Sequence, residues 1–334
     1  MDKDKSGMTE PAIGGYFGLE LPGGNAFLHS TAILVNSGRN ALEFIFKTMP
    51  RLPSTVWIPY YTCEVLLQPM SKLGLHYEFY NINDRLEVDV WPKLGDDDYI
   101  IVNNYFGIKD DYIWKLGCDK SILPHLIIDA SQAWYSPEIL SSHQFYSPRK
   151  FFGVPDGGVA FTSVSHDLPL QQGHSFQRCS HLLKRIDSGA RSGYGDFQNN
   201  DKALDYAPLT AMSKLTKTIL AGIDSEEVKY RRRRNFEILH CELATSNRLN
   251  IPDMDTFQCP MIYPYWSDDT TLRSKLIEQD IFVAKYWPNV MEWCGNETLE
   301  YDFAQNLLPL PCDQRYGDKD MERIINCIKN DRKK

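Results

Sequence analysis

The sequence has no run of 18 or more apolar residues and no apolar segment near its N-terminus. Transmembrane helices and secretion signals need such segments, so we expect a cytoplasmic protein without membrane insertion. The eight cysteines include no C-x-x-C pair, and the eight histidines are dispersed. This spacing predicts mostly reduced thiols and no metal site. Lys and Arg number 36 against 44 Asp and Glu, a net charge of -8, which argues against a nucleic-acid partner.

The chain does contain enough apolar residues for a large core: 43% of its 334 residues are hydrophobic. Short apolar runs predict buried strands at residues 56–58, 77–82, 99–102, 126–128 and 159–161. Helical spacing occurs between several of them, as in 41–49 and 64–73, where Pro69 is expected to kink or end the helix. This alternation predicts an α/β fold with a mostly parallel, doubly wound sheet and a site at the carboxyl ends of its strands.

The second half of the sequence has a different pattern of polar and apolar residues. Residues 192–205 are polar and predict a loop, and a helical pattern follows at 212–220. The basic run at 231–234 has acidic residues within one or two turns, so we expect a solvated, salt-bridged helix. Beyond it we predict a small α+β module, and the elements expected there are a strand at 261–266, a helix at 271–279, a strand at 282–286 and a terminal helix at 319–329. We therefore predict a disordered N-terminus (1–13), a large domain (14–222) and a small C-terminal domain (223–334).

One lysine stands among aromatic residues, directly before a Gly-rich turn and a strand. The segment is FYSPRKFFGVPDGGVAF, and the lysine is Lys150. In an apolar pocket a lysine loses part of its solvation, so its pKa falls and its neutral amine can attack a carbonyl. A lone lysine is otherwise most often a solvated loop residue.

A second segment, LIIDASQA, places an aspartate at the end of an apolar strand. At the active edge of a sheet, Asp129 can pair with a protonated pyridine nitrogen, and Gln132 can hydrogen-bond a ring hydroxyl. Taken alone, Asp129 is also compatible with a turn or a helix N-cap.

A third segment, LVNSGRNAL, predicts a strand-like stretch, then a Ser-Gly turn and then the start of a helix. Backbone N–H groups at such a helix start can bind a phosphate, and Arg39 can add positive charge. Helix capping by Ser37 followed by Gly38 explains the same pattern, and Arg39 would then point to solvent.

In this order, these segments resemble the DegT/DnrJ/StrS family of sugar aminotransferases, which have the aspartate-aminotransferase-like (type I) fold of pyridoxal 5'-phosphate enzymes. Further similarity lies in WIPYYTCEV and in the C-terminal stretches CPMIYPYW, LRSKLIEQDIFVAKYWPNV and FAQNLLPLPCD. The resemblance implies that Lys150 is the Schiff-base lysine. It further implies that Asp129 pairs with the pyridine nitrogen, that Gln132 lies near the ring oxygen, and that the turn formed by Ser37, Gly38 and Arg39 holds the phosphate.

The sequence departs from the family pattern at several positions. The family's phosphate-binding serine, five residues before the lysine, is Phe145 here, which leaves Ser147 as a substitute. The aromatic residue expected to stack on the ring after Thr62 is Cys63, and one of Tyr60, Tyr61 or Tyr105 is then expected to cover the ring. An asparagine that the family contributes from a neighbouring subunit has no clear counterpart.

The resemblance implies transfer of an amino group, with glutamate as donor, to a nucleotide-linked keto-deoxysugar, for cell-surface polysaccharide or related glycan biosynthesis. It also implies a homodimer. Two alternatives remain open at this point. One is another reaction on the same cofactor, such as dehydration of a sugar, although relatives that dehydrate tend to have histidine in place of the lysine. The other is a non-catalytic scaffold or regulatory protein that keeps the fold but binds cofactor weakly or not at all, which is suggested by Cys63 and Phe145.

Overall fold

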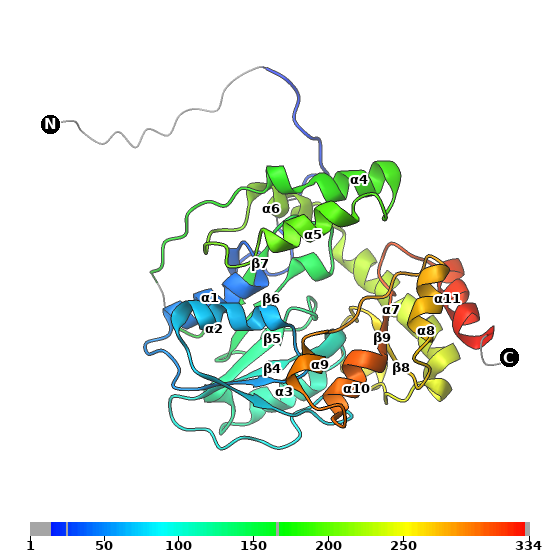
Figure 1. The fold of residues 1–334 in the computed structure, drawn as a ribbon. Helices are drawn as coiled ribbons and strands as arrows, with labels where there is room; N and C mark the ends of the chain where they lie inside the picture. Colours follow the sequence, from blue (N-terminus) through cyan, green and yellow to red (C-terminus); the bar gives the residue numbers. More distant parts are fainter. Residues whose placement is uncertain (1–14, 25, 165–166, 331–334) are drawn as a thin grey trace.

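The computed structural model describes residues 15–24, 26–164 and 167–330 (Figure 1). The N-terminal segment that we predicted to be disordered, residues 1–13, lies outside this part of the chain. Among the described residues, no helix combines the length and the apolar character needed to cross a membrane.

A seven-stranded sheet with the order β1-β7-β6-β5-β4-β2-β3 forms the centre of the large part. Its strands are β1 (Ile33–Val35), β2 (Val56–Pro59), β3 (Tyr77–Tyr80), β4 (Tyr99–Asn103), β5 (Leu126–Ala130), β6 (His143–Tyr146) and β7 (Gly158–Phe161). The pairs β3-β2, β2-β4, β4-β5 and β5-β6 are parallel, and β7 is antiparallel to both β6 and β1. The predicted α/β fold with a mostly parallel sheet is confirmed.

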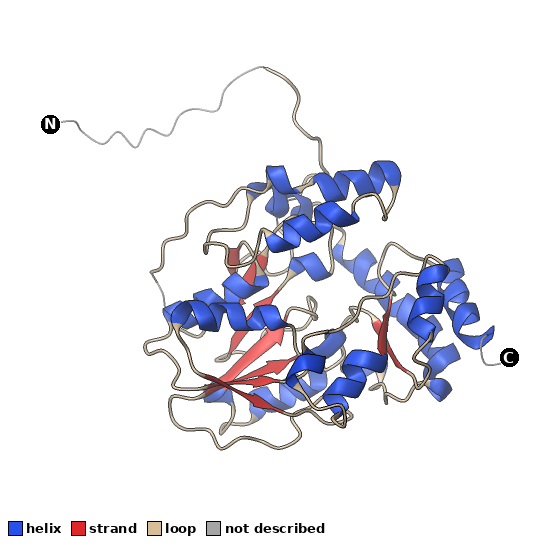
Figure 2. Cartoon of the chain, in the orientation of Figure 1, coloured by secondary structure: helices blue, strands red, loops and turns tan. Residues whose placement is uncertain are grey.

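Both faces of this sheet are buried, which explains why its strands are continuous apolar runs. In β4, Ile101 packs into the cluster that contains α1 (Gly38–Thr48) and α2 (Leu67–Leu73), whereas Ile100 packs into the cluster on the other face. That second face is covered in part by α3 (Asp110–Cys118). Figure 2 shows helices on both sides of the strands.

The helix predicted at 64–73 is a 3-10 turn, η1, followed by α2. Pro69 lies in the first turn of α2, where an N–H group has no partner within the helix in any case. The proline therefore does not end the helix, which continues to Leu73.

Short 3-10 turns connect several of the elements. They are η1 (Glu64–Leu66), η2 (Tyr105–Gly107), η3 (Leu123–His125), η4 (Pro148–Lys150), η5 (Phe176–Arg178), η6 (Ala244–Ser246) and η7 (Met254–Thr256).

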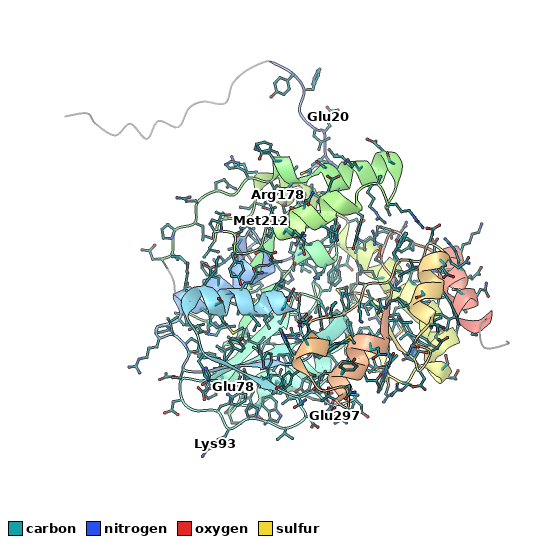
Figure 3. All side chains as sticks on the ribbon, in the orientation of Figure 1. Glu20, Glu78, Lys93, Arg178, Met212 and Glu297 are labelled. Atoms are coloured by element: carbon teal, nitrogen blue, oxygen red, sulfur yellow. The ribbon has the colours of Figure 1, made fainter. Side chains whose placement is uncertain are left out.

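Three helices follow β7 at one end of the sheet, and Figure 3 marks this region with the labels of Arg178 and Met212. They are α4 (Ser180–Ser188), α5 (Tyr194–Lys202) and α6 (Lys214–Ala221). The prediction of a loop over 192–205 is wrong, because α5 occupies most of it. The amide of Asn200 on α5 is buried and donates to the carbonyl of Pro155 at 2.9 Å, so a tertiary contact supports a helix that its polar sequence does not suggest.

The C-terminal part is built around a two-stranded antiparallel sheet of β8 (Tyr263–Trp266) and β9 (Leu307–Leu310). Its helices are α7 (Ser225–Leu243), α8 (Leu272–Glu278), α9 (Val290–Trp293), α10 (Leu299–Asn306) and α11 (Asp318–Asn330). The strand predicted at 282–286 is wrong. Ile281 and Val283 are buried while Phe282 between them is exposed, which is the alternation typical of a strand. The segment nevertheless joins no sheet, because the partner of β8 is β9.

The prediction of a solvated basic helix holds for only part of α7. Arg231 pairs with Glu227 and Arg234 with Asp318, but Arg232 is 2% exposed. Its guanidinium donates to the carbonyls of Met261 (2.9 Å), Phe151 (3.2 Å) and Pro260 (3.3 Å). Arg232 thus joins α7 and the segment before β8 to the loop that follows Lys150.

The domain boundary that we predicted between residues 222 and 223 falls in the link between α6 and α7. It stays a prediction, because a single apolar cluster contains residues of both the large sheet and the small one.

Candidate functional site

A cavity of about 130 Å³ lies at the carboxyl edge of the parallel strands. The start of α1 and the segments that follow β2, β4, β5 and β6 all contribute to its wall. Eight residues that the sequence analysis selected line this cavity: Ser37, Gly38, Arg39, Cys63, Asp129, Gln132, Ser147 and Lys150. Tertiary structure thus brings together segments that are more than 100 residues apart.

Asp129 is held at the centre of the edge by strand pairing. It is the register partner of Asn103 on β4 and of Phe145 on β6. The backbone N–H of Ser131 donates to its carboxylate at 2.8 Å. Burial raises the pKa of Asp129, against the hydrogen bonds from Ser131 and the positive charge of Lys150, which act to lower it. A buried carboxylate of this kind gains stability from a cationic partner.

Two buried amide groups in the cavity wall have atoms that find no partner among the described residues. The side chain of Gln132 accepts from the backbone N–H of Phe106, but its Nε2 donor is unpaired. Asn103 donates to Thr62, but its Oδ1 acceptor is unpaired. Buried polar atoms are normally satisfied, so the two atoms indicate that a polar ligand completes the site.

The predicted phosphate turn is formed at the start of α1. Ser37 is the N-cap residue, and its hydroxyl accepts from the backbone N–H of Asn40. A Cβ atom on Gly38 would lie 3.4 Å from the Cβ of Ser147, so Ser147 is directly beside the turn. A Cβ atom on Gly158 would lie 2.0 Å from the carbonyl oxygen of Ser37, so only glycine allows β7 to approach this closely.

Arg39 is buried against an acidic partner and does not point to solvent. Its side chain is 8% exposed, and its guanidinium forms an ion pair with Asp205. The same guanidinium donates to Gln68 at 3.3 Å, and Gln68 donates to Asp205 at 2.9 Å. The role of Arg39 at a phosphate stays a prediction.

The sequence analysis missed Arg149, which also lines the cavity. Its Nη1 atom lies 3.0 Å from Oδ1 of Asp201 on α5. Burial lowers the pKa of Arg149, and the negative charge of Asp201 acts against this shift. The signal was available in the sequence, because Arg149 precedes Lys150 directly in the motif.

The three aromatic residues that we expected to cover a ring lie elsewhere. Tyr60 stacks on Phe79, and Tyr61 packs against Tyr105 in the core. The aromatic side chains that do line the cavity are Trp287, from the C-terminal part, and Phe145. Cys63 lines it as well, and burial raises the pKa of its thiol.

Lys150 is more open than the sequence analysis expected. It is exposed in this single chain and lies where the first cavity meets a second one of about 520 Å³. Its Nζ atom is 5.9 Å from the centre of the Tyr286 ring. The larger cavity is bounded by η4, α4, α5 and the C-terminal part, and its lining includes Arg185, Arg315 and the aromatic rings of Tyr194 and Phe197. The expectation of a closed apolar pocket around Lys150 is therefore wrong for this chain by itself.

Comparison with protein-family models gives no match, and neither does comparison with curated proteins. Solved structures do match. The sugar aminotransferase CalS13 from Micromonospora echinospora is 14% identical with a TM-score of 0.61, over 90% of this chain and 88% of that one. A DegT DnrJ EryC1 StrS aminotransferase from Brucella abortus is 15% identical with a TM-score of 0.59, over 91% and 86%.

DesV of S. venezuelae, solved in complex with a ketimine intermediate, is 17% identical with a TM-score of 0.59, over 90% of this chain and 84% of its own. At these identities the likeness shows the fold. The chain has the fold of these aminotransferases, so the predicted type I, aspartate-aminotransferase-like fold is confirmed.

Proposed function

We propose that the protein is a pyridoxal 5'-phosphate-dependent aminotransferase that moves an amino group from glutamate to a nucleotide-linked keto-deoxysugar. One observation carries the proposal. Lys150, Asp129 and the helix-start turn at Ser37, three groups from distant segments, line a single cavity in a fold that this chain shares with sugar aminotransferases.

The residues present fit this cofactor. The unpaired Nε2 of Gln132 is a donor suited to the ring hydroxyl, and the buried carboxylate of Asp129 suits a protonated pyridine nitrogen. The N–H groups of the first helical turn, at Gly38 and Arg39, have no partners within the helix and suit a phosphate. When bound, the cofactor supplies an electron sink for negative charge at the substrate carbon.

The side chains of the cavity then have distinct roles. The amine of Lys150 would hold the cofactor covalently, and it is also the group that would move the proton at the substrate carbon. The Asp129 carboxylate keeps a proton on the pyridine nitrogen. Trp287 and Phe145 give the cavity an apolar part of its wall. The neighbouring cavity leaves one side of Lys150 open to a large substrate.

The larger cavity is where we propose that the nucleotide sugar binds. Although the chain carries a net charge of -8, the lining contains Arg185 and Arg315. Guanidinium groups bind phosphate oxygens with paired hydrogen bonds. The exposed rings of Tyr194 and Phe197 offer stacking surfaces for a base. An aminated nucleotide sugar is a building block for cell-surface polysaccharides or related glycans, and we propose that role for the product.

We also propose that the protein acts as a homodimer. Leu183 and Ile186 on α4 and Tyr194 on α5 are 54%, 82% and 59% exposed. Large apolar side chains gathered on neighbouring helices often mark an interface. Light scattering after gel filtration measures the mass directly, and a mass of one chain at all concentrations contradicts this part of the proposal.

The central test is chemical labelling of the cofactor lysine. Protein incubated with pyridoxal phosphate and reduced with borohydride should carry the label on one peptide, at Lys150. Lys150→Ala should abolish the label, and Lys214→Ala, on the surface of α6, should keep it. Label on another lysine, or none in the wild type, overturns the proposal. Mass spectrometry of products from a panel of nucleotide keto-sugars with glutamate then identifies the reaction.

A further inference from the structure

Two arginines in the wall of the cofactor cavity share one carboxylate oxygen. Oδ1 of Asp201 lies 3.0 Å from Nη1 of Arg149 and 4.0 Å from Nη2 of Arg39. The two arginine side chains are 14% and 8% exposed, whereas Asp201 is 49% exposed. Arg149 therefore holds a carboxylate oxygen that is itself half exposed, and Arg39, whose short ion pair is with Asp205, lies 4.0 Å from the same oxygen.

This oxyanion lies in the wall of the same cavity as the predicted phosphate turn. Arg39 is the second residue of α1, and Arg149 follows two residues after Ser147, which lies beside Gly38. All of these residues line the same cavity, and Asp201 lines it too. A phosphate oxygen at the start of α1 can therefore take the place that the carboxylate oxygen of Asp201 has in this structure.

A phosphate and the Asp201 carboxylate repel each other at such short range. Arg149 can bind either anion, but both together would place about three negative charges, in addition to that of Asp205, beside two guanidinium groups. Asp201 is the group free to leave, because its side chain is half exposed and it sits in the last turn of α5. A carboxylate at a helix C-terminus is also disfavoured by the helix dipole once its cation is gone.

We propose that Arg149 is the principal side-chain ligand of the cofactor phosphate and that Asp201 is a displaceable counter-ion that competes with the phosphate for it. The proposal rests on the proposed function and adds to it a residue for the phosphate and a competitor for the same site. Figure 1 shows α5 near the end of the sheet that carries β7. The Asp201 side chain on α5 is half exposed, so it can turn into solvent. Binding of the cofactor then loosens the contact between α5 and the site.

Substitutions of Arg149 and Asp201 are expected to change the affinity for pyridoxal phosphate in opposite directions. Arg149→Met should weaken binding of pyridoxal phosphate by about tenfold or more, as for loss of a charged hydrogen-bonding partner. Asp201→Asn should tighten it by roughly three- to tenfold, because a competing charge is removed while the shape is kept. In the double variant the gain from Asp201→Asn should disappear, because it acts through Arg149.

The measurement is a titration of cofactor-free protein at constant ionic strength, followed by the quenching of tryptophan fluorescence. Pyridoxal, which has no phosphate, serves as the matched ligand, and its affinity should not change in either variant. Asp318→Asn is the matched control variant, because it removes a carboxylate of nearly equal exposure, 51% against 49%, from another arginine. This control should bind pyridoxal phosphate like the wild type.

A second probe, inorganic phosphate, separates the two proposals. Phosphate should raise the melting temperature of Asp201→Asn more than that of the wild type, and should not raise that of Arg149→Met. If the phosphate results hold but borohydride fixes no cofactor on Lys150, the anion site stands and the proposed function fails. If the cofactor is fixed but Asp201→Asn leaves its affinity unchanged or weaker, the competition is refuted and the proposed function stands.

Discussion

Asn103 and Asp129 are register partners on the neighbouring parallel strands β4 and β5, so both side chains leave the sheet at the same level of its carboxyl edge. Asn103 offers an unpaired acceptor there, and Asp129 a buried carboxylate. Such an arrangement is costly for folding unless a ligand uses it. The unpaired acceptor of Asn103 and the buried carboxylate of Asp129 therefore link the stability of the protein to its proposed activity.

Asp129→Asn should therefore remove activity and stabilise the cofactor-free protein. Burial raises the pKa of Asp129 in the folded state above its usual 3.8. A raised folded pKa means that the stability contribution is full below the unfolded pKa and is lost as the pH rises through the folded value. At neutral pH the ionised carboxylate thus opposes folding, and the amide does not.

Thermal unfolding of the cofactor-free protein measures this effect. The melting temperature of Asp129→Asn should exceed that of the wild type at pH 7, and the gap should narrow toward pH 4. Aminotransferase activity should fall by orders of magnitude with an unchanged circular dichroism spectrum. A fully active variant excludes the proposed role of Asp129 at the pyridine nitrogen.

Arg39→Ala should weaken cofactor binding by about 1.5–3 kcal/mol if the guanidinium donates to the phosphate. The residue also holds Asp205, in the turn that follows α5, so the substitution frees that carboxylate as well. Titration of the cofactor-free variant gives the dissociation constant. An unchanged value would restrict Arg39 to the docking of α5 through Asp205.

Gly158→Ala should disrupt the phosphate turn. The added Cβ would lie 2.0 Å from the carbonyl oxygen of Ser37 and 2.7 Å from the nitrogen of Gly38, so the turn or β7 must move. Gly153→Ala, in the same loop, places a Cβ 3.5 Å from the nearest atom outside its chain neighbours, a side-chain carbon of Leu182, and should be tolerated. The comparison is made by cofactor titration and thermal unfolding. Equal behaviour of the two variants contradicts the close approach that we describe.

Arg232→Ala should destabilise the protein by on the order of 3 kcal/mol, because it leaves buried carbonyls without their donor. Those carbonyls belong to Phe151, Pro260 and Met261. Its neighbour Arg231, in an exposed pair with Glu227, is the control, and Arg231→Ala should change the free energy of unfolding by only about 0–0.5 kcal/mol. Urea titration of both variants measures the difference. A small loss for Arg232→Ala would show that water replaces the guanidinium.

Local sequence patterns were enough to predict six of the seven strands of the central sheet, all but β6, and eight residues of the cavity wall. A strand buried on both faces reads as a continuous apolar run, and in a parallel sheet the residue at its carboxyl end reaches the common edge. For that reason Asp129 could be placed at the edge from LIIDASQA alone, and Ser37 at a helix start from LVNSGRNAL. These inferences need only local patterns and one rule of topology.

Only the tertiary structure decided which distant side chains complete the site. Trp287 lines the cavity from a segment that we expected to follow a strand, while Tyr61 and Tyr105 turn into the core. The polar segment before Asp205 folds as α5 and brings Asp201 to Arg149, and the basic run of α7 buries Arg232. These outcomes depend on which charges and rings from distant parts of the chain meet. The free energy of such contacts is set by burial and by partners that no local pattern specifies.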